Sequence, residues 1–212
     1  MTETAVEHLQ LMTVDGVALQ ADLAVPAAAH AAAIICHPHP QYGGNRHNNV
    51  VQALFDALPT AGVAALRFDF RADFDDGRGE QLDAMAALNA LEVRLPGLAL
   101  IATGYSFGAA IVSALDDVRI TTKVLVAPPL ASMPTDRGPT DRGPRVRGMD
   151  VPTLVLTPTH DQFSAPDATE AIISDWPQTT HETIASTDHF LNGRTALVAE
   201  RAVAFITRTP CA

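Results

Sequence analysis

The chain has 212 residues, of which 47% are hydrophobic and 18% charged, a composition that fits one compact domain and excludes an intrinsically disordered protein. Its formal net charge at pH 7 is −10, from 14 lysines and arginines against 24 aspartates and glutamates. No basic stripe with interleaved aromatic residues is present, so we expect neither a nucleic-acid partner nor binding to anionic membranes.

The cysteines and the N-terminus indicate a reduced, cytoplasmic setting. Cys36 ends an apolar run and is read as a buried core residue, whereas Cys211 lies one residue from the C-terminus, so no disulfide framework is expected. The first ten residues, MTETAVEHLQ, are not those of a signal peptide. No apolar run approaches the roughly 18 to 20 residues that span a bilayer.

The first half of the chain opens with two predicted strands and then alternates strands with helices. Asp15-Gly16 separates the first two strands and is suited to a two-residue hairpin turn. By hydrophobic periodicity, the expected strands are 8–14, 17–25, 32–36 and 63–68, and the expected helices are 48–58 and 82–92.

The second half continues this alternation. The expected strands are 98–103, 123–127, 152–157 and 178–184, and the expected helices are 109–115, 166–176 and 194–207. Strands that alternate with helices form right-handed crossovers in a parallel sheet. We therefore predict a single α/β domain over residues 1–212, with a mostly parallel central sheet, an antiparallel N-terminal edge and helices on both faces.

Residues 129–150 differ in composition from the rest. They contain the direct repeat PTDRG PTDRG, and proline and glycine at this density exclude a helix or a central strand. A flexible, solvated loop is the default interpretation. The alternative is a basic flap that attracts anionic substrates, because the segment carries four arginines, namely Arg137, Arg142, Arg145 and Arg147.

The stretch ATGYSFGAAIVSAL contains the spacing Gly104-x-Ser106-x-Gly108 between a predicted strand and a predicted helix. This spacing is typical of a nucleophile elbow, in which a serine projects from a sharp strand-to-helix turn. The two glycines would permit the strained turn. Because small residues also serve tight packing, the motif alone is a weak signal.

A serine nucleophile needs a histidine base, which in turn needs an acid to orient it. Asp161 follows the strand predicted at 152–157, and His189 follows the strand predicted at 178–184. The order serine, acid, histidine is that of α/β-hydrolases, and ligands collect at the carboxyl ends of parallel strands. Asp167 and Asp188 are the alternative acids. Asp188 is poorly placed, because adjacent side chains usually diverge.

Two backbone N–H groups are the candidate donors to the developing oxyanion. One is that of Phe107, directly after the serine at the start of its helix. The other lies in the loop His37-Pro38-His39-Pro40, where the prolines carry no N–H, so His39 is the best-placed donor.

The histidines His37, His39 and His47 also allow a metal site. However, His-x-His with a distant third histidine is a thin signal for the three or four ligands that zinc requires. We expect neither a metal nor another cofactor.

Five segments together resemble the small, lidless α/β-hydrolases related to dienelactone hydrolases and bacterial serine esterases. They are CHPHPQYGGNRHNNVV, LRFDFR, GRGEQLDAMAAL, GYSFGA and DHFLNGR, and the resemblance covers roughly residues 30 to 205. It implies a serine hydrolase that uses Ser106, Asp161 and His189 without a cofactor.

The chain departs from these relatives in two places. The segment RFDFRADFDDGRGE replaces an Arg-Gly-x-Gly-x-Ser-type turn and is richer in acid, so that wall of the pocket is expected to differ. The nucleophile is serine rather than the cysteine of dienelactone hydrolases proper, so their lactone specificity does not carry over. The predicted strands 123–127 and 152–157 are too close for a helical lid domain, which predicts an open site.

The sequence therefore predicts hydrolysis of small carboxylic esters through an acyl-enzyme. A thioesterase or small-peptide hydrolase would use the same residues, and a non-catalytic binding module on the same fold is the alternative from another class. The expected partner is a small-molecule ester, and a homodimer through an edge strand or the terminal helix stays open.

Overall fold

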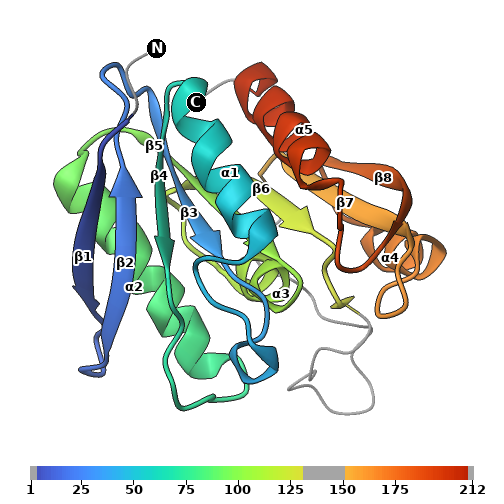
Figure 1. Cartoon of the computed structure of the whole chain (residues 1–212), viewed down its shortest axis with the longest axis horizontal. Coiled ribbons are helices and arrows are strands. Elements are labelled where there is room, and N and C mark those ends of the chain that lie inside the picture. Colours follow the sequence, from blue (N-terminus) through green and yellow to red (C-terminus); the bar gives the residue numbers. More distant parts are fainter. Residues whose placement is uncertain (1–3, 131–150, 210–212) are drawn as a thin grey trace.

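The computed structural model describes residues 4–130 and 151–209 and contains one eight-stranded sheet (Figure 1). The repeat at 134–143 and Cys211 lie outside these residues. The strands are β1 (Val6–Met12), β2 (Ala18–Ala24), β3 (Ala31–Cys36), β4 (Val63–Phe68), β5 (Ala99–Tyr105), β6 (Ile120–Val126), β7 (Thr153–His160) and β8 (Thr179–Asp188).

The strand order is β1-β2-β4-β3-β5-β6-β7-β8. The strand β2 pairs antiparallel with both β1 and β4, and every later pair is parallel. The predicted antiparallel N-terminal edge and parallel centre are therefore confirmed. The carboxyl ends of β3 and β5 to β8 meet at one edge of the sheet, where α/β proteins bind their ligands.

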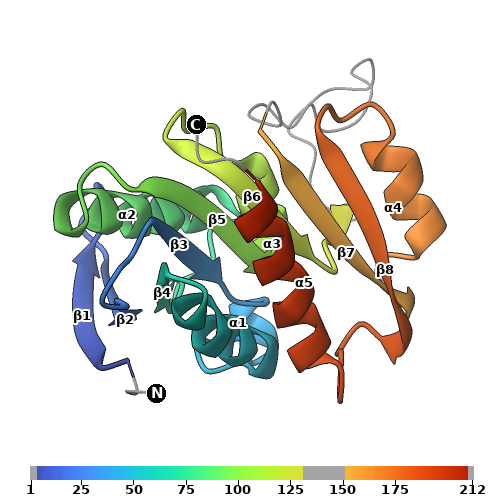
Figure 2. The same cartoon turned by 90° about the horizontal axis from the view of Figure 1, so that it is seen from above.

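Five helices cover both faces of the sheet, as predicted. They are α1 (Asn49–Thr60), α2 (Arg78–Arg94), α3 (Phe107–Ala114), α4 (Pro166–Ile173) and α5 (Thr195–Arg208). Helices α1 and α5 lie side by side on one face, and the core on the other face is built with α2, α3 and the end of α4 (Figure 2). Each face has its own apolar core, so the sheet is a buried middle layer.

The strand β3 shows why the central strands appear in the sequence as continuous runs of apolar residues. Ala32, Ile34 and Cys36 pack into the core on the α2 and α3 face. Ala31, Ala33 and Ile35 pack into the core on the α1 and α5 face. All six side chains are inaccessible to solvent, as expected for a parallel strand covered on both faces. Cys36 is thus a core residue, and burial raises the pKa of its thiol.

The hairpin between β1 and β2 differs from the predicted two-residue turn. The Thr13 N–H donates to the Val17 carbonyl at 3.0 Å, and the Gly16 N–H donates to the Thr13 carbonyl at 3.1 Å. These bonds enclose a three-residue loop. Gly16 takes a left-handed φ of 85° at its last position, which is the usual place for glycine in loops of this length.

Residues 127–152 join β6 to β7, and no α-helix lies in the part of this connection that the structure describes. Within residues 4–130 and 151–209, no helix combines the length and the apolar character needed to cross a membrane.

Lys123 is a buried cation at the far end of α3 from Ser106. Its side chain is almost fully buried under α3, and its Nζ donates to the Leu115 carbonyl, at the C-terminal cap of the helix, at 2.8 Å. A cation is favoured at a helix C-terminus, yet burial dominates and lowers the pKa of Lys123 to about 8.

This buried lysine predicts a pH-dependent stability difference between the native protein and Lys123→Met. Between about pH 8 and 10.5 the unfolded chain keeps the lysine proton that the folded chain releases, so the lysine's contribution to stability rises with pH by about 3 kcal/mol. The measurement is urea unfolding of both proteins from pH 7.5 to 10.5. Cys36 and Tyr105 also titrate differently on folding but are common to both proteins, so they cancel. A difference that is flat with pH would contradict the prediction.

Candidate active site

Ser106 occupies the turn between β5 and α3 in a strained backbone conformation. Its φ is 54° and its ψ is −121°, and a non-glycine residue in such a region costs about 1 to 3 kcal/mol. The turn is fixed on both sides, because the Ser106 N–H donates to the Val126 carbonyl at 2.8 Å and its carbonyl accepts from Ala110 N–H at 3.1 Å. The sequence predicted this strand-to-helix turn.

The glycines of the motif serve close packing rather than the strained torsion angle. Neither Gly104 nor Gly108 has a positive φ; the strain lies on Ser106 itself. A Cβ on Gly108 would lie 2.3 Å from the Cys36 carbonyl oxygen, and a Cβ on Gly104 would lie 2.3 Å from the Gly108 carbonyl oxygen. The missing side chains therefore allow α3 to approach the ends of β3 and β5 and bring Ser106 to the sheet edge.

Ser106, His189 and Asp161 form a hydrogen-bonded chain at the carboxyl edge of the sheet. The Ser106 Oγ lies 2.8 Å from Nε2 of His189, and Nδ1 of His189 lies 2.8 Å from Oδ2 of Asp161. Asp161 follows β7 directly and His189 follows β8 directly. The structure brings together the three side chains that the sequence singled out. Both the carboxylate and the imidazole are almost fully buried, whereas Ser106 is half-buried.

Two backbone donors orient the Asp161 carboxylate. Its Oδ1 accepts from the N–H groups of Phe163 at 2.8 Å and Ser164 at 2.9 Å, which leaves Oδ2 for the histidine. These bonds satisfy a buried charge that would otherwise be costly.

The two alternative acids, Asp188 and Asp167, have other surroundings than the His189 imidazole. Asp188 Oδ1 accepts from the Phe190 N–H at 3.1 Å, within the turn after β8. Asp167 lies in the first turn of α4. Of the three carboxylates weighed, Asp161 is the one bonded to the imidazole.

Tyr105 binds the backbone of His189, a role that was not predicted from the sequence. Its hydroxyl donates to the His189 carbonyl at 2.8 Å. Burial raises the pKa of Tyr105, which keeps the phenol protonated and able to donate. The sequence could have indicated this role, because Tyr105 directly precedes Ser106. A side chain at the end of β5 lies close to the loops that follow the neighbouring strands.

His37 and His39 have structural partners that bear on the metal alternative. The imidazole of His37 is buried, accepts from the Phe70 N–H through Nε2 at 2.9 Å and contacts the Pro38 carbonyl through Nδ1 at 2.5 Å. Burial lowers the pKa of both histidines, which favours the neutral imidazole. In the described parts of the chain, no three His, Cys, Asp or Glu side chains gather as a metal-binding group.

The loop after β3 brings His39 next to Phe107. The His39 and Phe107 rings lie 4.7 Å apart, and the His39 carbonyl accepts from the N–H groups of Tyr42 and Gly44, both at 3.1 Å. Among the described residues, neither the His39 N–H nor the Phe107 N–H donates a hydrogen bond to another protein group. Both amides are therefore left without a protein acceptor in the described residues.

The acidic segment after β4 is held by two ion pairs of Arg71, of which the pair with Asp83 is buried. Arg71 binds Asp83 in α2 and Asp15 in the β1–β2 loop, each at 2.8 Å. The Glu80 carboxylate accepts from the N–H groups of Asp75 at 3.0 Å and Gly77 at 2.9 Å, and so helps to begin α2 at Arg78, earlier than predicted. The segment is thus a firmly supported wall next to Phe107.

Two depressions in the described surface lie away from Ser106. One, of about 320 Å³, lies between β1 and α2, and another, of about 440 Å³, lies between α1 and α5. Ser106 itself is half-buried at the carboxyl edge of the sheet.

The sheet order, the antiparallel β2 and the serine turn after β5 define an α/β-hydrolase fold. More particularly, the chain has the architecture of the small α/β serine hydrolases without a lid. It superposes on an α/β serine hydrolase homologue from Coxiella burnetii with a TM-score of 0.82 and 26% identity, over 96% of this chain and 98% of the other. A serine hydrolase without a lid from Xanthomonas campestris matches with a TM-score of 0.80 and 27% identity, over 100% of this chain and 98% of the other.

Comparison of sequences alone finds less similarity than comparison of structures. No protein-family model matches the chain. An uncharacterised protein of Rickettsia prowazekii (strain Madrid E) is 40% identical over 84 residues, which are 36% of this chain and 35% of that protein. The chain thus matches about a third of the length of that relative.

Proposed function

We propose that the protein is a serine hydrolase that cleaves carboxylic esters of small acyl groups through an acyl-enzyme. The observation that carries the proposal is the continuous hydrogen-bonded chain from Ser106 through His189 to Asp161. A half-buried serine on a strained turn, bonded to an imidazole that a buried carboxylate orients, is the arrangement that activates a serine.

In the proposed reaction the Ser106 Oγ attacks the ester carbonyl while His189 Nε2 takes its proton. Asp161 holds the Nδ1–H tautomer and stabilises the imidazolium that forms. The amides of Phe107 and His39 are the proposed donors to the oxyanion, which the N-terminus of α3 also favours. The imidazolium returns its proton to the leaving alcohol, and water then releases the acyl group by the reverse steps.

The incomplete burial of Ser106 supports the choice of small or solvent-exposed esters. A long acyl chain would need an apolar tunnel to bury it, and the two depressions described above lie on other faces of the molecule. The proposal needs no cofactor, and we propose that the protein acts in the cytoplasm.

The test is covalent labelling of the native protein with a fluorophosphonate probe, combined with hydrolysis of p-nitrophenyl esters from acetate to decanoate. We expect the label on Ser106 by peptide mapping and rates that fall as the acyl chain lengthens. The buried Ser113 in the same helix is the internal control and should stay unlabelled. Absence of both labelling and hydrolysis would contradict the proposal and favour a binding module.

A further inference from the structure

Aromatic side chains form a wall beside Ser106. We call the four residues His39, Tyr42, Phe74 and Phe107 the aromatic wall. The His39 ring is at its centre, with centroid distances of 4.9 Å to Tyr42, 4.6 Å to Phe74 and 4.7 Å to Phe107. Because Phe107 directly follows Ser106, the wall begins one residue from the serine hydroxyl.

Two further phenylalanines flank the other end of the Ser106–His189 pair. The Phe163 ring lies 4.8 Å from the His189 ring, and the Phe190 ring lies 6.0 Å from it. Their exposed fractions are 56% and 51%, so neither is a core residue. An ester carbonyl at Ser106 would thus have aromatic surface within reach in two directions.

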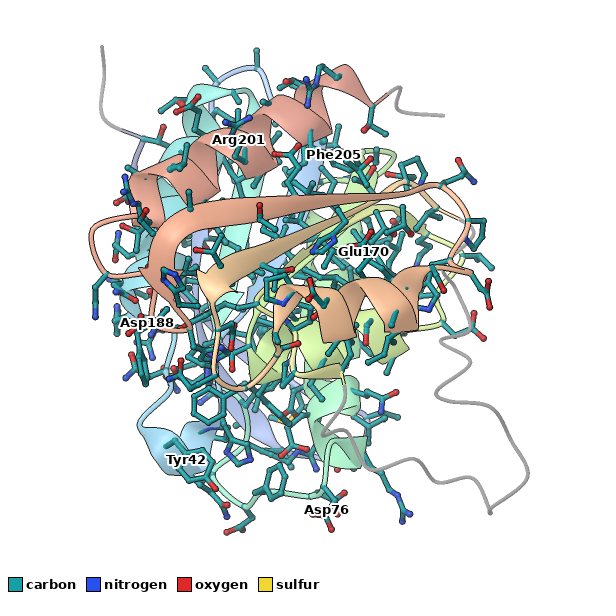
Figure 3. The ribbon with its side chains drawn as sticks, turned by 90° about the vertical axis from the view of Figure 1, so that its right-hand side faces the viewer. Tyr42, Asp76, Glu170, Asp188, Arg201 and Phe205 are labelled. Carbon is teal, nitrogen blue, oxygen red and sulfur yellow. The ribbon has the colours of Figure 1, made fainter. Side chains whose placement is uncertain are left out.

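The distribution of exposed aromatic residues argues that this surface binds something. The aromatic residues among the large exposed apolar side chains of the described residues are Tyr42, Phe163 and Phe190. Phe163 and Phe190 lie next to the His189 ring, and Tyr42 lies next to His39 in the aromatic wall. Exposed apolar surface gathered at one place marks a binding site more often than exposed residues scattered singly. Figure 3 shows Tyr42 and Asp76 together at one end of the molecule and Phe205 of α5 at the opposite end.

The segment that carries Phe74 is held on both sides before any ligand arrives. Phe74 lies between Arg71, which is fixed by Asp83 and Asp15, and Gly77, whose N–H is bound by Glu80. A preorganised wall loses little conformational entropy when a ligand binds. The segment also bears exposed carboxylates on both sides of Phe74, at Asp73, Asp75 and Asp76, which disfavour an anionic ligand.

We propose that the preferred substrates are uncharged esters that carry an aromatic ring two or three bonds from the scissile ester group, in either the acyl or the alcohol part, and that this ring packs on the aromatic wall. The inference rests on the proposed function, because it assigns the substrate class of the same site. Tyr42 and Phe74 are the specificity residues, since they offer the ring edges and faces that aromatic pairs favour.

The experiment compares ring-matched ester pairs. The acyl pair is methyl 3-phenylpropanoate and methyl 3-cyclohexylpropanoate, and the alcohol pair is 2-phenylethyl acetate and 2-cyclohexylethyl acetate. In both pairs two methylenes insulate the ester from the ring, so intrinsic reactivity is matched. We expect a kcat/KM about fivefold higher for the phenyl member of at least one pair, the size that aromatic packing adds beyond burial.

The variants Phe74→Leu and Tyr42→Leu keep apolar bulk but remove the ring. We expect each to bring the ratio of kcat/KM for the phenyl ester to kcat/KM for the cyclohexyl ester closer to one. Phe205→Leu, at the opposite end of the molecule, is the matched control and should keep the native preference. A native preference near one in both pairs would overturn the inference, as would a preference that survives both ring deletions.

Failure of the inference is separable from failure of the proposed function. Turnover of the cyclohexyl esters without a phenyl preference overturns the inference alone. No turnover of any of the four esters also overturns it, and fluorophosphonate labelling then decides the rest. A label on Ser106 retains the serine hydrolase, whereas an unlabelled serine removes both.

Discussion

Replacement of Ser106 by alanine is expected to lower kcat for p-nitrophenyl acetate by about a million-fold, down to the small rate that binding and oxyanion donors alone supply. The variant loses the attacking oxygen and leaves His189 Nε2 without its 2.8 Å partner. Alanine suffers the same positive φ as serine, so the backbone strain stays and stability should change little.

Ser113→Ala is the matched control, because Ser113 lies in the same helix and donates to the Ala110 carbonyl, away from the imidazole. It should retain activity within a few-fold of the native protein. Circular dichroism and thermal unfolding establish that both variants fold. Equal rates in Ser106→Ala and the native protein would remove Ser106 from the mechanism.

Replacement of Asp161 by asparagine is expected to lower kcat by about ten-thousand-fold while leaving the fold intact. The reason lies in the two N–H groups of Phe163 and Ser164, which both donate to Oδ1. An asparagine must keep its oxygen there, so its NH₂ group faces His189 Nδ1. That nitrogen must then be an acceptor, which places the proton on Nε2 and prevents the imidazole from accepting one from Ser106.

Asp188→Asn is the control that separates the two candidate acids. Asp188 accepts from the Phe190 N–H, a bond that an asparagine oxygen can also make, so its kcat should stay within a few-fold of the native value. The measurement is kcat for both variants on the same ester at saturating concentration. A large loss in Asp188→Asn with little loss in Asp161→Asn would reverse the assignment of the acid.

The positions of Ser106, Asp161 and His189 could be predicted because they depend on a simple geometric rule. Each follows a strand of apolar residues, and the ends of parallel strands meet at one edge, so sequence separations of 83 and 28 residues did not matter. The layered fold was predictable for the same reason, since the periodicity of each element shows which face is buried.

The features that sequence analysis missed depend on contacts between loops. The aromatic wall joins rings from the loop after β3, the segment after β4 and the start of α3, and no local pattern fixes their approach. The Arg71 ion pairs likewise link three separate segments. The hairpin was mispredicted because Asp-Gly suits both two- and three-residue loops, and the Thr13–Val17 backbone bond selected the longer one.

The connection between β6 and β7 separates the proposed catalytic residues into two groups along the chain. The part of the chain before it carries Ser106 with its strained turn and the proposed oxyanion donors, whereas the part after it carries the proposed base and acid, His189 and Asp161. The two parts meet through the pairing of β6 with β7. On the proposed function, Ser106 in a growing chain therefore lacks its histidine until β8 is made and docked, and keeping the two parts separate would give an inactive protein.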